Sequence, residues 1–174
     1  MSAISGRERL QPSLLDRLTD NNRAAKRDGP DTQALTIAQL RAAVLRDLGW
    51  LFNTTNLESL DDLGDAPNIQ KSSLNYGIPG LSGLLENSSR VRTLEEQLAN
   101  AVRNFEPRIK SETVRVRARG ATDDGGMRAL VFEIAGELWA QPVPVQLFVE
   151  TRIDVETRTA VVTEAKARAL NDGS

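Results

Sequence analysis

Two absences limit the chemistry that this sequence can perform: its 174 residues include neither cysteine nor histidine. The chain therefore has no thiol nucleophile, no imidazole general base, no Cys/His zinc site and no disulfide. Catalysis would have to use carboxylates, Lys, Tyr, Ser/Thr or a carboxylate-bound metal. Most common enzyme mechanisms are excluded on this ground alone.

Paired carboxylates are the main catalytic device left, and glycoside hydrolysis would need two of them across a cleft. We expect Glu96 to cap a helix, Glu95 to be exposed beside it, and Glu133 and Glu137 to point outward from a strand. Only Glu106 has no such structural explanation. One carboxylate makes no acid/base pair, so we predict no catalytic residue.

The tripeptide Glu106-Pro107-Arg108 has two interpretations. Proline disfavours helical geometry in the residue before it, so the tripeptide is consistent with a helix stop that carries a local ion pair. It is equally consistent with a rigid, charged corner that presents Glu106 and Arg108 to a partner. Composition and spacing do not separate the two.

The net charge of −2 conceals two charged segments of opposite sign. Residues 57–66 contain four carboxylates but lack the ligand spacing of a calcium loop, so we interpret them as a solvated acidic loop with core-facing leucines. The stretch 108–119 is basic, but its outward face lacks the aromatic residues of a base-stacking sheet. We expect no metal, no cofactor and no nucleic-acid partner.

The elements that position these residues follow from hydrophobic periodicity. Thr36 and Gln39 have capping-box spacing before an apolar stripe that extends to Leu51, and Thr93 with Glu96 repeats that spacing before a helix that ends near Phe105. Alternating patterns then predict strands over 113–119, 128–138, 145–155 and 160–164. The predicted class is α+β, with N-terminal helices packed on one face of a mainly antiparallel three- to four-stranded sheet formed by the C-terminal half.

We expect one domain over residues 1–174. Its expected features are a flexible N-terminus (about 1–10), a polar linker near 21–33 and a loose C-terminal tail (about 165–174). The N-terminus lacks the apolar core of a signal peptide, and apolar runs fall short of the roughly 20 residues that span a bilayer. A cytoplasmic location without direct membrane insertion is therefore expected.

Five segments together resemble a known family. They are QPSLLDRLTD, VLRDLGWLFNT, SSLNYGIPGLSG, FEPRI and GELWAQPVPVQLFVET, in the family's order, and they cover roughly Leu10 to Val162. On these segments the chain resembles the TssE baseplate subunits of bacterial type VI secretion systems. Those subunits lie within the phage baseplate-wedge family that is often labelled "lysozyme-like".

The resemblance implies a structural subunit in a cytoplasmic baseplate docked at the inner membrane. Its implied partners are the TssF and TssG wedge subunits and the contractile TssB/TssC sheath, whose assembly it would template by strand addition at an open sheet edge. The family's Glu-Pro-Arg motif maps onto Glu106, Pro107 and Arg108, which the resemblance identifies as partner-binding residues. The "lysozyme" label implies the alternative, a peptidoglycan-cleaving hydrolase with Glu106 as its acid.

Overall fold

The computed structural model describes residues 13, 16, 18, 36–80, 88–124, 127–139 and 144–165. The expected flexible N-terminus and linker, and the tail beyond Ala165, lie outside these residues. Near the start, the Asp16 amide donates to Ser13 Oγ at 3.3 Å, and Asp16 and Leu18 are helical. This is the N-cap geometry that Ser13 is suited to form.

Helix α2 (Ile37–Phe52) begins at the predicted capping box. Thr36 Oγ1 accepts from the Gln39 amide at 3.2 Å, and the Gln39 side chain accepts from the Thr36 amide at 2.9 Å. The apolar stripe is buried from Leu40 onward. Ile37 is 47% exposed and is not part of the core, because it lies in the first turn of α2, beyond the edge of the sheet.

Helix α4 (Ser88–Phe105) ends where Pro107 predicted it would. Its start differs from the prediction: Thr93 lies inside the helix, so the proposed cap at Thr93 with Glu96 is wrong. Residues 88–92 contain neither Gly nor Pro, so nothing in the backbone stops the helix from extending one turn further.

Four strands form an antiparallel meander in the order β1-β2-β3-β4. They are β1 (Arg115–Asp124), β2 (Met127–Leu138), β3 (Val145–Asp154) and β4 (Ala160–Glu164). The bounds of β2, β3 and β4 agree closely with the ranges predicted from the sequence. Strand β1 continues through the predicted loop because the register shifts between Ala118 and Gly120, a bulge in which Gly120 takes φ 121°.

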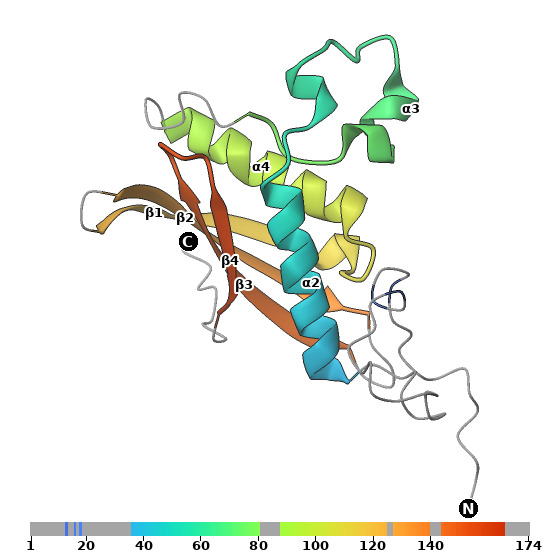
Figure 1. Cartoon of the computed structure of the whole chain (residues 1–174), viewed down its shortest axis with the longest axis vertical. Helices are drawn as coiled ribbons and strands as arrows, with labels where there is room; N and C mark the ends of the chain where they lie inside the picture. Colours follow the sequence, from blue (N-terminus) through green and yellow to red (C-terminus); the bar gives the residue numbers. More distant parts are fainter. Residues whose placement is uncertain are drawn as a thin grey trace, which may run out of the picture.

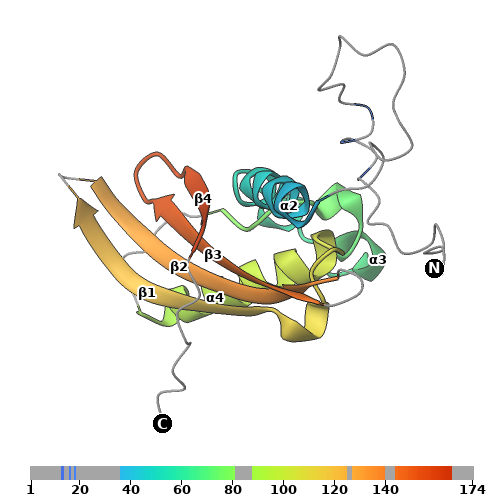
Figure 2. The same ribbon diagram turned by 90° about the horizontal axis from the view of Figure 1, so that it is seen from below.

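The two long helices cross one another over one face of the sheet (Figure 1). Helix α2 packs toward β4 and α4 toward β1. Figure 2 shows the curvature of the sheet against these helices. One cluster of buried side chains joins α2, α4 and the inner faces of β2 and β3, among them Leu48, Leu98, Phe132, Val149 and Ile153. The predicted fold class is confirmed.

Residues 53–80 form a lobe of short turns that projects beside α4 (Figure 1). They contain η1 (Leu57–Ser59), α3 (Pro67–Gln70) and η2 (Ser73–Asn75). Gly77 has φ 127°, and a Cβ there would lie 2.4 Å from the Thr54 carbonyl oxygen, so only glycine fits.

The lobe differs from the prediction in two side chains. Leu60 and Leu74 are 78% and 69% exposed, although both were expected to pack inward. The buried amides of Asn56 and Asn75 instead hold the turns, and Leu63 and Ile78 provide the apolar contacts. Within the described residues, no helix has the length and apolar character needed to cross a membrane.

Candidate functional site

The Glu-Pro-Arg corner (Glu106, Pro107, Arg108) joins the end of α4 to the sheet. The Glu106 amide still donates to the Val102 carbonyl at 2.9 Å, and Pro107 then turns the chain. The Trp139 amide donates to the Arg108 carbonyl at 2.8 Å, and Ile109 bridges to Leu138 at the end of β2. Hydrogen bonds on both sides therefore fix the backbone of the corner.

Glu106 and Arg108 pair with one another. Arg108 donates through Nε to Glu106 Oε1 at 2.6 Å, through its amide to the same oxygen at 3.1 Å, and through Nη2 to Oε2. The Glu106 side chain is only 3% exposed, while that of Arg108 is 22% exposed. Two parallel contacts between a guanidinium and a carboxylate are the strongest geometry for such a pair.

Helix α2 contributes the next carboxylate. Asp47 Oδ2 lies 2.5 Å from Arg108 Nη2, and Asp47 Oδ1 accepts from Arg46 Nε at 2.8 Å. Arg46 Nη1 reaches Asp16 Oδ1 at 2.7 Å. Each guanidinium therefore lies between two carboxylates, and the network links the N-terminal segment, α2 and the corner.

The network shifts several pKa values, and those of Arg108 and Asp16 show the causes. Burial opposes the charged form of Arg108, but hydrogen bonds and charges from Glu106 and Asp47 outweigh it and raise its pKa. Burial would raise the pKa of Asp16, but hydrogen bonds from Ser13 and Arg46 and nearby positive charge lower it below its ordinary value. Both groups are thereby held in their charged forms.

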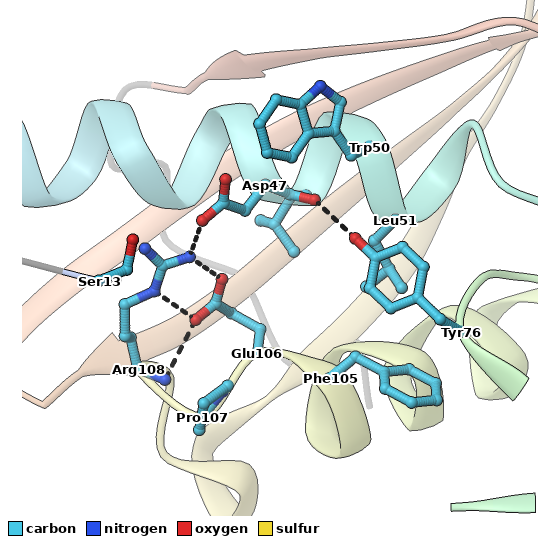
Figure 3. A pocket seen from close by; sticks show the side chains of 10 residues that line it. Ser13, Asp47, Trp50, Leu51, Tyr76, Phe105, Glu106, Pro107 and Arg108 are labelled. Atoms are coloured by element: carbon cyan, nitrogen blue, oxygen red, sulfur yellow. Dashed lines mark hydrogen bonds and ion pairs between the residues drawn. The ribbon is translucent and has the colours of Figure 1, made fainter. Parts of the chain in front are cut away.

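An open pocket of about 480 Å³ lies between the network and the lobe (Figure 3). Leu51, Tyr76, Phe105 and the half-exposed Trp50 contribute its apolar lining, and the charged corner forms its polar end. The rings of Tyr76 and Phe105 meet edge to face, with centroids 5.4 Å apart. We call this feature the Trp50 pocket.

The structure brings together all three residues that the sequence singled out. The structure contains features of both interpretations of the corner. The local ion pair of the first interpretation is present. The second interpretation needs accessible groups, and Pro107 is exposed while Arg108 is half-buried. The carboxylate of Glu106 is directed inward, so any contact made by the corner must come through the other two residues. Partner binding stays a prediction.

Sequence reasoning missed the contribution of α2 and of the aromatic residues. Arg46 and Asp47 were recognisable only as charges outside the apolar stripe, and Trp50 as a large residue near its edge. Their proximity to residue 108 comes from the crossing of α2 over the end of α4, which leaves no local signal in the sequence.

The other carboxylates considered above are engaged elsewhere. Glu95 was expected to be free on the surface, but its Oε1 accepts from the Ala118 amide of β1 at 2.5 Å. Glu137 pairs with Lys110, and Glu133 with Arg119 at 2.6 Å. The sequence left open whether Arg115 or Arg117 lies opposite Glu133, and the β1–β2 register places Arg117 there.

The acidic segment is solvated, with its four carboxylate residues Glu58, Asp61, Asp62 and Asp65 all exposed. Among the described residues, no three acidic side chains come close enough to hold a metal ion. The basic stretch carries its charge on the outer face of β1 and around the corner.

The chain is an α+β protein in which a charged corner with internally paired groups adjoins a pocket with aromatic lining. The family model for baseplate wedge protein gp25 matches residues 38–143, and the chain belongs to that family. Searches of curated proteins and of solved structures find no match. The family agrees with the resemblance above, because TssE subunits are gp25-like proteins, and it supports a structural role in a phage-tail-like baseplate.

Proposed function

We propose that this chain is a non-enzymatic subunit of a type VI secretion baseplate that links the wedge to the contractile sheath and helps to template sheath assembly. It acts in the cytoplasm, in a baseplate docked at the inner membrane. The observation that carries the templating role is the amide and carbonyl of Val162 on the edge strand β4, which point away from β3 and bond to no described side chain.

Side chains bond to the outer edge of β1 at one amide within the strand and at one carbonyl just before it. Glu95 occupies the Ala118 amide, and the Val114 carbonyl accepts from Arg103 Nη2 at 3.2 Å and from Arg115 Nη1 at 3.0 Å. Two of these three side chains extend from α4. Covering edge groups in this way prevents another strand from pairing there.

Among the described residues, the side-chain hydrogen bonds to backbone groups on the β4 edge lie at the start of the strand. Asn53 binds both the amide and the carbonyl of Ala160, at 2.9 and 2.8 Å. The bond from Asp154 N to Thr159 O fixes the alternation of the ladder, so the amide and carbonyl of Val162 point away from β3. No described side chain bonds to these two groups, and a sheath strand can pair with them.

A proline at Val162 tests the templating role. Val162→Pro removes an outward amide without removing a β3–β4 hydrogen bond, and Val116→Pro makes the matched change on the β1 edge, two residues before the Ala118 amide that donates to Glu95. We expect Val162→Pro to abolish sheath assembly, seen as loss of fluorescent TssB/TssC sheaths in the native host, and Val116→Pro to leave it intact. Normal sheaths with a folded Val162→Pro variant would refute the proposal.

The Glu-Pro-Arg corner is proposed as the contact with the TssF and TssG wedge subunits. Pro107 and Arg108 supply the accessible groups, and the buried Glu106 orients the guanidinium. Co-purification with TssF and TssG is the direct measurement. Arg108→Ala should weaken it, whereas Arg152→Ala, which removes an exposed arginine on the outer sheet face, should not.

The geometry gives no support to a hydrolase. Glu106 is 2% exposed, and both its oxygens accept from Arg108, so it is poorly placed to protonate a glycosidic oxygen. Asp47, the nearest partner carboxylate, binds the same guanidinium. A muramidase assay on the purified chain, with Glu106→Gln as control, tests this. Muramidase activity that is present in the unchanged chain and lost in Glu106→Gln would establish the hydrolase alternative.

A further inference from the structure

The outer face of the sheet, opposite the two long helices, has a row of side chains that ends in an exposed valine on β4. Val131 of β2 is in register with Arg152 of β3, and Arg152 with Val161 of β4. Their strand neighbours belong to the core on the other face, so these three side chains share the outer face. Val131 is only 6% exposed, whereas Val161 is 55% exposed. The row therefore has a buried apolar end within the sheet and an uncovered apolar end at its edge.

The neighbouring row on the same face is polar. It consists of Arg117, Glu133, Glu150 and Thr163, in register across the four strands. Arg152 Nε donates to Glu150 Oε1 at 2.9 Å, so the charged end of Arg152 interacts with this second row. Val161 and Thr163 are both exposed and lie two residues apart on one face of β4, but they end rows of different chemistry.

The centre of β4 lacks the charged side chains that commonly protect an edge strand from pairing. Residues 161–163 are Val, Val and Thr, whereas β1, the other edge strand, contains Arg115, Arg117 and Arg119. The outward amide and carbonyl of Val162 lie between Val161 and Thr163. A strand that bonded to them would bring its own side chains beside those of Val161 and Thr163, because cross-strand neighbours on one face lie in contact.

We propose that Val161 is a specificity-determining residue for strand addition at β4: the partner strand places an aliphatic or aromatic side chain beside Val161, and this position excludes charge. Pairs of β-branched and aromatic side chains stabilise neighbouring strands, whereas a charge covered by an apolar neighbour loses water without gaining a partner. A charge at residue 163 would instead lie opposite Glu150. This inference rests on the proposed templating function, which supplies the strand.

Lysine substitutions at the two positions test this chemistry with the same charge on the same face of the same strand. The measurement is the number of fluorescent TssB/TssC sheaths per cell in the native host. Val161→Lys should lower it about tenfold or more, because the lysine would be covered without a partner. Thr163→Lys is the matched control and should leave it unchanged, since that lysine can pair with Glu150. Normal sheaths with Val161→Lys, or equal losses in both variants, would overturn the proposal.

Two smaller substitutions keep the test decisive if Val161→Lys fails to fold. Val161→Ile retains the apolar branched side chain and should assemble normally. Val161→Thr retains the shape but replaces a methyl group with a hydroxyl, and should give fewer sheaths than Val161→Ile. Both should keep the urea unfolding midpoint of the unchanged chain, because residue 161 is largely exposed. Equal sheath numbers in these two folded variants would refute the apolar contact.

The variant Val162→Pro distinguishes this inference from the templating role itself. If Val162→Pro abolishes sheaths while the folded Val161 variants all assemble normally, strand addition stands and the apolar requirement at Val161 is refuted. If Val162→Pro assembles normally, templating at the β4 edge fails, and the requirement at Val161 fails with it. Loss in Val162→Pro together with the expected order at position 161 would support both.

Discussion

At the scale of single residues, Asp47 connects parts of the chain that are far apart in sequence. Its two oxygens bind Arg46 and Arg108, and its backbone carbonyl accepts weakly from the Tyr76 hydroxyl at 3.4 Å. The sequence left open whether residues 106 and 108 pair with one another or face a partner. It could not indicate Asp47, which is 61 residues from Arg108, because only tertiary packing brings them together.

The Glu106–Arg108 pair should contribute strongly to stability, because breaking one partner leaves a buried charge. We expect Glu106→Ala to lower the free energy of unfolding by about 3 kcal/mol, with Glu106→Gln less severe. Glu150 and Arg152 form a natural control with the same spacing but 31% and 54% exposure. Glu150→Ala should cost less than about 0.5 kcal/mol. If urea denaturation showed equal losses of unfolding free energy for Glu106→Ala and Glu150→Ala, the role of burial would be contradicted.

Tyr76 permits a direct measurement of the pocket's field. Its pKa lies above the ordinary value near 10, so the native state keeps the phenol proton at a pH where the unfolded state has lost it. Stability should therefore fall as pH rises from about 10 through the native pKa. Absorbance of the single tyrosinate reports the pKa, which should return to about 10 in urea. An identical titration in both states would contradict the assignment.

At the scale of elements, the parts with local signals were predictable. Alternation located β2, β3 and β4, and the capping box located α2. The start of α4 was misplaced because the capping-box spacing at Thr93 falls inside the helix, and residues 88–92 contain no Gly or Pro to end it. The extension of β1 was not predictable from a local pattern, because pairing with β2 carries the strand across Gly120.

Asn53 joins two elements and should stabilise β4 beyond the effect of a helix cap. Its side-chain amide pairs with both backbone groups of Ala160. Asn53→Ala should lower the free energy of unfolding by about 2 kcal/mol, since two part-buried hydrogen bonds are lost. Amide exchange at Ala160 should also accelerate. Thr54→Ala, which removes an exposed hydroxyl bond to Trp50, should leave that exchange rate unchanged.

At the scale of the whole molecule, one core spans both helices and the sheet. The same cluster contains Leu48 and Leu51 of α2, Leu98 of α4 and Phe132 of β2. No separate cluster divides the described residues into two units that could unfold independently. The single domain expected from the sequence predicts one cooperative transition.

The two tryptophans test this cooperativity because they report from different elements. Trp50 lies on α2, and Trp139 follows β2. Trp50→Phe and Trp139→Phe each leave one fluorescent probe, and both should give unfolding midpoints that coincide with the loss of far-ultraviolet circular dichroism in the same variant. Separate transitions within one variant would show that the helices and sheet unfold independently.

The side chains that α4 places along β1 have a consequence for how an assembly begins. A sheet that is extendable at both margins can propagate through successive copies of itself, as in a fibril. Here Glu95 occupies the Ala118 amide of β1, whereas no described side chain bonds to the outward amide and carbonyl of Val162 on β4. Under the proposed templating role, strand pairing would therefore start at the β4 edge, and that edge would fix its direction.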